Sequence, residues 1–230
     1  MTSSGTYAFQ PAVGDLILNA YARCNIRGPE LTSQHLQDAA MEVNLLNVQF
    51  SNRNPNQYAL ETPTITLTQG VSTYSLPNRT LAIGIVYITQ NFSTPSAFDR
   101  PLGPVSASDY GAIPNKTIQA APTIFNFQLF PVPEIKFWPV PDGNGTYVAN
   151  VQSFRQQQDL SITGGQTLDA PYRFLDAFTA GLAARLARIY APALYQMRKQ
   201  DWEEAWQEVI TLDQPDDTYF ITPGLSSYFY

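Results

Sequence analysis

Few side chains in this sequence could do acid–base or nucleophilic chemistry. There is one histidine, His35, and one cysteine, Cys24. His35 stands in the first turn of an expected helix, where a surface or capping role is favoured over catalysis. Cys24 falls at helical spacing from Ala20 and Tyr21, which indicates a small buried group with no disulfide partner and fits a reducing cytoplasm. A histidine-based hydrolase triad and a thiol or histidine metal site are hard to build from this set, so we expect no catalytic residue, no cofactor and no metal.

Two glycine-containing stretches resemble ligand loops only in part. The stretch "PDGNGT" places Asp142, Asn144 and Thr146 at alternate positions, as calcium loops do, but Ser153 stands where a bidentate acid would follow. The stretch "ITGGQT" has glycines without the Lys-Ser or Lys-Thr ending of a phosphate loop. Both are interpreted as turns, and no nucleotide site is expected.

Charged residues near the C-terminus form a basic section followed by an acidic one. Five of the 13 bases lie between positions 173 and 199, and seven of the 19 acids lie between positions 201 and 217. The carboxylates of "DWEEAWQE" are interpreted as a solvated helix face, because their spacing gives no sign of the converging pair that a cell-wall hydrolase would need. We expect neighbouring copies of the chain to pair through the two sections. The expected subunit-interface residues are Arg185, Arg188, Arg198, Asp201 and Glu204.

The composition favours a surface that meets other proteins. Charged residues make up 14% of the chain, against about 25% in an average globular protein. A surface with so few charges does little to keep monomers apart, so the composition favours self-assembly. The alternative is a monomer whose surface is polar because it is rich in Asn, Gln, Ser and Thr. The net charge of −6 gives no overall attraction to phosphate, although an acidic surface suits a channel through which DNA slides.

Periodic apolar residues predict two helices at the start of the chain. Residues 14–27 form an amphipathic stretch that stops at Gly28 and Pro29. Thr32 or Ser33 caps a second helix, which ends near residues 51–56. Its expected buried positions are Leu36, Ala40, Val43, Leu46 and Phe50.

Two more helices are expected at the other end, separated by a break at Pro192. Each of these helices has a stripe of apolar residues along one face. Small residues beside the stripe of the first helix would let a neighbouring helix approach closely. The first stripe comprises Leu175, Phe178, Leu182, Leu186 and Ile189. The second comprises Leu194, Met197, Trp202, Ala205, Trp206 and Val209.

Between the helices the apolar period changes to two, which predicts antiparallel β structure. Alternation through Ile65 and Leu67 and through Tyr74 and Leu76 predicts a β-hairpin with its turn at Gln69 and Gly70. Further strands are expected in "LAIGIVYIT", "TIFNFQLF", "EIKFWPV" and "TYVANVQSF". The stretch "RPLGPVSASDYGAIPNK" is expected to be a long connection with at most one short helical turn.

These elements predict an α+β fold, in which N-terminal and C-terminal helices form a helical bundle with an inserted antiparallel β domain. The expected divisions are residues 1–60 and 169–213 for the bundle helices, 61–168 for the β insertion and 214–230 for an extended C-terminal tail. The first residues lack a basic start followed by an apolar core, and no run of eighteen apolar residues occurs, so we expect neither secretion nor a membrane span.

The C-terminal tail is uncharged and aromatic after position 217. A segment this short, broken by Pro and Gly, does not fold alone, so we expect it to be a strap that docks on a partner; packing on its own domain is the alternative. The expected partner-docking residues are Tyr219, Phe220, Ile221, Leu225, Tyr228, Phe229 and Tyr230.

The order of several stretches resembles the head-to-tail adaptor, or head-completion, proteins of short-tailed bacteriophages (podoviruses). The stretches are "GDLILNAYARCNI", "NLLNVQF", "ITLTQGVSTYSLP", "PLGPVSASDYGAIPNK", "APTIFNFQL", "IKFWPVPDGNGTY", "LDAPYRFLDAFTAGLAARLARIYAP" and "WEEAWQEV". Each is weak alone, and their order and spacing over residues 14–213 carry the resemblance. The aromatic tail and the long middle segment depart from the shorter adaptors.

The resemblance implies a non-enzymatic virion protein that forms a twelve-membered ring below the portal and above the tail nozzle or hub. Such a ring surrounds the DNA channel at the head–tail junction, passes DNA without sequence-specific binding, seals the packaged head and assembles in the host cytoplasm. The alternative is a carbohydrate- or protein-binding β module of a phage tail, with exposed aromatics such as Tyr87, Phe92 or Trp138.

Overall fold

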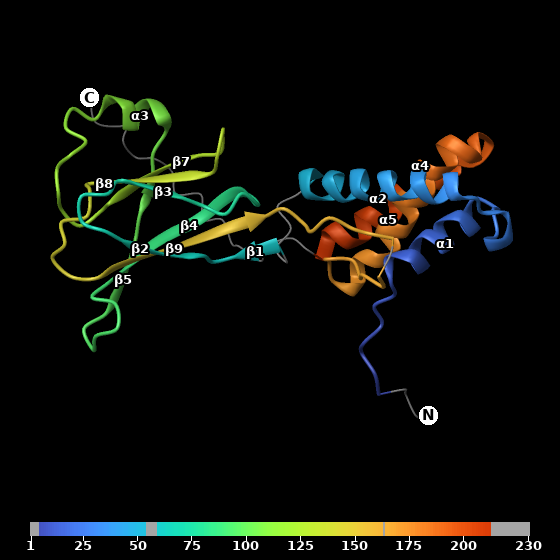
Figure 1. The fold of residues 1–230 in the computed structure, drawn as a ribbon, viewed down its shortest axis with the longest axis horizontal. Helices are drawn as coiled ribbons and strands as arrows, with labels where there is room; N and C mark the ends of the chain where they lie inside the picture. Colours follow the sequence, from blue (N-terminus) through green and yellow to red (C-terminus); the bar gives the residue numbers. More distant parts are fainter. Residues whose placement is uncertain (1–4, 54–58, 163, 213–230) are drawn as a thin grey trace, which may run out of the picture.

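The computed structural model describes residues 5–53, 59–162 and 164–212. The four long helices gather at one end of the long axis, and the strands lie at the other together with one short helix (Figure 1). This arrangement confirms the predicted α+β class with strands inserted between two pairs of helices. Residues 213–230, which include the predicted strap, lie outside the described residues.

The first helix, α1, spans Val13–Arg23 and buries the face predicted from the sequence. It ends four residues before the predicted position because Asn25 adopts a left-handed φ of 63°. The Ile26 N–H then donates to the Tyr21 carbonyl at 3.0 Å and the Asn25 N–H to the Ala22 carbonyl at 3.1 Å. This pair of bonds closes the last turn in the manner of a Schellman motif.

The second helix, α2, spans Ser33–Arg53 after a short 3-10 turn, η1, at Gly28–Glu30. Its buried apolar residues are Ala39, Val43, Leu46 and Phe50. Leu36 was predicted to be buried but is 40% exposed, because the buried face is displaced by one residue in the first half of the helix.

The helix α4 spans Leu175–Tyr190, preceded by η3 at Tyr172–Phe174, and packs against α1, α2 and α5. Its small residues are buried as predicted. An ideal Cβ on Gly181 would lie 2.7 Å from Trp202 Nε1, so glycine is what lets α5 approach so closely. The predicted break appears as η4, Pro192–Leu194, and α5 follows at Tyr195–Leu212. Ile189 and Met197 were predicted to be buried but are exposed, since both lie near this break, where the helices stop covering each other.

Nine strands form two sheets in the described residues. The first sheet is antiparallel and has the order β1-β9-β4-β5, with β2 also paired to β9. Its strands are β1 Leu60–Glu61, β2 Thr64–Leu67, β4 Thr80–Gln90, β5 Phe98–Pro101 and β9 Tyr147–Arg155. The second has the order β3-β8-β7-β6. Its strands are β3 Thr73–Ser75, β6 Gly103–Pro104, β7 Ile124–Gln128 and β8 Glu134–Trp138.

The two sheets bury one apolar core between them, to which Val86 and Ala149 contribute from one side and Ile135 and Phe137 from the other. The pairing is antiparallel as predicted except at one point, where β6 runs parallel to β7. Residues 105–123, which hold one short helix, α3 (Ala107–Ala112), lie between the two strands and return the chain to the same edge of the sheet. The predicted long connection, residues 100–116, therefore contains β6 as well as the expected short helix.

The predicted hairpin around Gln69 and Gly70 was wrong. Strand β2 pairs with β9 in the first sheet, whereas β3 pairs with β8 in the second. The turn exists, and Gly70 has the positive φ of 76° that favours glycine, but it carries the chain from one sheet to the other. The alternation of apolar and polar residues shows which face of each strand is buried. It is compatible both with two strands paired side by side and with two strands that face each other across a core.

After β9 the chain runs along the helices rather than staying with the sheets (Figure 1). Leu160, Leu168 and Ala170 from this segment are buried in the helical core. Asn44 on α2 holds the segment by two 2.9 Å hydrogen bonds, donated from its Nδ2 to the Leu160 carbonyl and from the Leu160 N–H to its Oδ1. The segment from 156 to 170 is therefore part of the helical packing.

Candidate docking surfaces

The two residues with the most reactive side chains are occupied in packing. The His35 N–H donates to Thr32 Oγ1 at 3.4 Å, while His35 Nδ1 accepts from the Thr32 N–H at 3.2 Å. This is a capping box with histidine in place of glutamate, and it confirms the predicted capping role. The ring of His35 also stacks on Tyr190, with centroids 4.3 Å apart. Cys24 is buried with its thiol directed at the Ala183 carbonyl at 3.4 Å, and burial raises the pKa of that thiol.

Both suspected ligand loops are turns, as predicted. Asp142 accepts hydrogen bonds from the Asn144 N–H at 2.9 Å and from the Tyr147 hydroxyl at 3.0 Å. The bond from the Asn144 N–H is the main reason why the pKa of Asp142 lies below its usual value. Gly164 and Gly165 have φ values of 92° and 67°. Across residues 5–53, 59–162 and 164–212 no three His, Cys, Asp or Glu side chains gather as a metal site would require.

The predicted interface residues divide into two groups. Arg185 donates to Glu42 and to Gln49 within the bundle, each at 2.7 Å, and Arg198 donates to Asp201 on its own helix at 2.7 Å. These side chains already have partners inside the chain. The other two, Arg188 on α4 and Glu204 on α5, are exposed to solvent. Glu204 accepts only a side-chain hydrogen bond from Gln200 among the bonds of the described residues.

A basic pocket lies where α2, α4 and α5 meet. Its volume is about 250 Å³. Three cationic side chains border it, and no acidic side chain does. The lining residues are Gln49, Ala184, Arg185, Arg188, Tyr195, Lys199 and Trp202. The pocket can receive an anionic group.

An apolar groove of about 560 Å³ lies between the end of α2 and the strands. Leu81, Leu129, Phe130 and Phe154 provide most of its apolar lining. Phe130 is 76% exposed, which is unusual for a large aromatic side chain in a folded domain. The groove is a second candidate docking surface.

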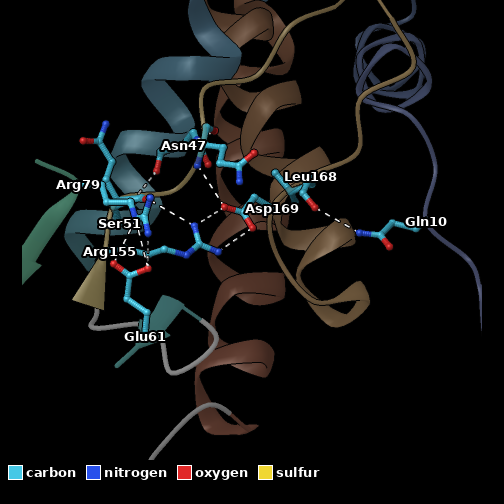
Figure 2. Close-up of polar contacts among 10 residues, drawn as sticks. Gln10, Asn47, Ser51, Glu61, Arg79, Arg155, Leu168 and Asp169 are labelled. Atoms are coloured by element: carbon cyan, nitrogen blue, oxygen red, sulfur yellow. Dashed lines mark hydrogen bonds and ion pairs between the residues drawn. The ribbon is translucent and has the colours of Figure 1, made fainter. Parts of the chain in front are cut away.

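One ion pair links β9 to the segment that packs on the helices, and a second lies beside it within the β part (Figure 2). Arg155 binds Asp169 through two bonds of 2.5 and 2.9 Å, and the Gln158 N–H donates to the same carboxylate at 3.2 Å. Burial alone would raise the pKa of Asp169, but the hydrogen bonds from Arg155 and Gln158 outweigh it, so this pKa lies below its usual value. Beside them Arg79 binds Glu61 at 3.0 to 3.2 Å.

Two further bonds tie the same junction together. Asn47 Nδ2 on α2 donates to the Gln158 carbonyl at 2.9 Å, and Gln10 Nε2 donates to the Leu168 carbonyl at 3.3 Å (Figure 2). Arg155 on β9 is bound to the same segment, so we expect these contacts together to hold the strands in a fixed orientation relative to the bundle. Sequence reasoning missed this junction, because nothing in the sequence marks which charges pair across the two parts.

The aromatics proposed for carbohydrate binding do not form an exposed set. Phe92 is 50% exposed, but Tyr87 and Trp138 are partly covered. The Trp138 indole N–H also donates to the Asn115 carbonyl at 2.9 Å, which leaves it no donor for a ligand. Of the three side chains, only Phe92 presents a large exposed ring.

In the described part of the chain no helix is both long and apolar enough to cross a membrane. A search of curated proteins gave no match to this chain. The family model described as SU10 adaptor protein matches residues 9–224, which covers both helical pairs and all strands. Members of this family are bacteriophage adaptor proteins, and this chain belongs to the SU10 adaptor protein family.

Proposed function

We propose that this chain is the head-to-tail adaptor of a short-tailed bacteriophage. In this proposal twelve copies form a ring between the portal and the tail nozzle or hub, surround the DNA channel and seal the packaged head. The observation that carries the proposal is the family match over residues 9–224. DNA passes through the ring without sequence-specific binding, in keeping with the net charge of −6.

The docking surfaces support an assembly role. A heterologous ring needs two different, complementary faces on each copy. The bundle presents a basic pocket, and the junction presents an apolar groove. The rigid junction at Arg155 and Asp169 would keep these surfaces at a fixed angle in every copy. As a component of the virion at the head–tail junction, the protein would assemble in the host cytoplasm.

The aromatic C-terminal segment supplies a further contact in this proposal. Residues 219–230 hold the expected docking side chains and dock either on the portal or on a neighbouring copy. A buried aromatic anchor contributes about 2 kcal/mol or more to binding, so a few of them suffice to hold a strap.

Native mass spectrometry of the purified chain, alone and mixed with portal rings, tests the proposal. We expect a stoichiometric complex with the portal that carries one adaptor copy per portal subunit. A chain that stays monomeric and unbound beside intact portal rings would refute it. Glycan-array binding by the isolated monomer would instead favour the alternative of a carbohydrate-binding tail module, for which Phe92 is the exposed candidate.

A further inference from the structure

Four charged side chains on α4 and α5 are exposed and form no ion pair within the described residues. Arg188 and Lys199 are cationic, and Glu204 and Glu208 are acidic. Their neighbours Arg185 and Arg198, by contrast, are held by Glu42 and Asp201 inside the chain. Two cations and two acids without an ion pair in the described part of the chain therefore remain on these two helices.

The acidic side chains and Lys199 lie on different sides of α5. At 100° per residue, Glu204 is about 140° from Lys199 around the helix and Glu208 is about 180° from it. Lys199 borders the basic pocket together with Arg188, whereas Trp202 and Trp206 face the core and leave Glu204 and Glu208 on the outer face. Opposite charges placed this way cannot reach each other within one molecule.

Among the described residues the acidic pair also lacks a cationic partner. Glu204 and Glu208 are four residues apart on a helix, and like charges at this spacing destabilise the helix. The three cations around the pocket repel one another too, and Glu42 offsets only Arg185. Contact with a surface of opposite charge would stabilise both the acidic pair and the basic pocket.

We propose that Glu204 and Glu208 of one copy bind Arg188 and Lys199 at the basic pocket of a second copy. The contact is heterologous, so it repeats around a ring instead of closing as a pair. It rests on the proposed ring and names the surface through which neighbouring copies meet. A phosphate group is the competing occupant, but among the described residues α4 and α5 carry two cations and two acids without an ion pair, and the net charge of −6 disfavours nucleic acid.

Charge reversal in two separate chains tests this contact. One variant carries R188E and K199E, and the other carries E204K and E208K. Each is expected to self-associate, alone or on portal rings, at least about tenfold more weakly than the unaltered chain, because attraction becomes repulsion at every interface. A mixture of the two is expected to recover assembly, with the variants alternating around the ring.

A matched control variant carries R27E and K116E, which change the net charge as much as R188E and K199E do. Arg27 and Lys116 are exposed and lie away from the basic pocket. This variant should assemble like the unaltered chain. Circular dichroism should show native helix content in all variants, since none of the altered positions is buried.

Native mass spectrometry at increasing salt then separates the outcomes. Reversed variants that assemble like the unaltered chain, or a mixture that fails to recover, would overturn the charge contact while leaving the portal complex, and hence the adaptor proposal, intact. If R188E with K199E abolishes binding of a short DNA oligonucleotide without affecting assembly, the pocket is a phosphate site and the contact is wrong. An unaltered chain that neither self-associates nor binds portal rings would overturn both proposals.

Discussion

Replacing Asp169 by asparagine keeps the shape of the side chain but removes the charge that Arg155 binds. Asp169 accepts two hydrogen bonds from Arg155 and one from the Gln158 N–H. The side chains of Arg155 and Asp169 are 20% and 24% exposed, so water compensates only partly for the loss. A hydrogen bond to a charged group contributes about 1.5–3 kcal/mol, and we expect D169N to lower the free energy of unfolding by about 2 kcal/mol.

The neighbouring pair of Arg79 and Glu61 provides a matched control. Its geometry is similar, but the Arg79 side chain is 60% exposed. Exposed ion pairs contribute about 0.2–1 kcal/mol, so E61Q should cost less than 1 kcal/mol. Equal losses for D169N and E61Q would refute the argument that burial at the junction makes the Asp169 pair the stronger one.

The assay is thermal and urea unfolding followed by circular dichroism, with a double-mutant cycle for Arg155 and Asp169. For a chain of this size 1 kcal/mol corresponds to about 2–4 °C in Tm, so D169N should lower Tm by about 4–8 °C. The R155M and D169N changes should be non-additive by about 1 kcal/mol or more, since both break the same contact. Additive effects would show that the ion pair does not hold the two parts together.

The remaining predictions concern the pH dependence, the helix contact and the tail. Because the folded-state pKa of Asp169 lies below the usual 3.8, its contribution is fully present at neutral pH and is lost as the pH falls below that value; the stability difference between the unaltered chain and D169N should shrink in acid. G181A should destabilise by up to about 2 kcal/mol, because overpacking against Trp202 costs about 1–3 kcal/mol and the better helix propensity of alanine returns only about 1. G111A, at a helical glycine with no atom within 4 Å of the added carbon, should be neutral or stabilising, and equal effects of the two would contradict the packing argument. Deleting residues 219–230 should leave circular dichroism and Tm unchanged but weaken attachment to the portal or to neighbouring copies; undiminished assembly would rule out the strap.

The helices could be predicted because their periodicity is local. Leu175 and Phe178 on α4 and Trp202 and Trp206 on α5 were predicted to be buried and are buried. The strands could be located for the same reason, but their partners could not. Alternation identifies the buried face of β2 and of β3 and does not say whether they pair side by side or face each other across a core.

Charged side chains were harder to assign, because their partners lie far away in the sequence. Arg185 looks available on its helix, yet Glu42, which comes 143 positions earlier, lies within 2.7 Å of it. Arg188 has no acidic partner in the ranges that the structure describes and is exposed there, although the local sequence of the two arginines is similar. Lys199 was not among the predicted interface residues, and only the fold brings it beside Arg188 at the pocket.

Electron cryomicroscopy of the full chain bound to portal rings tests the adaptor proposal most directly. The account predicts a closed ring of adaptor copies coaxial with the portal, surrounding the channel, with α5 of each copy facing the basic pocket of the next. Isolated copies scattered on the portal, or no density beyond the portal itself, would contradict it.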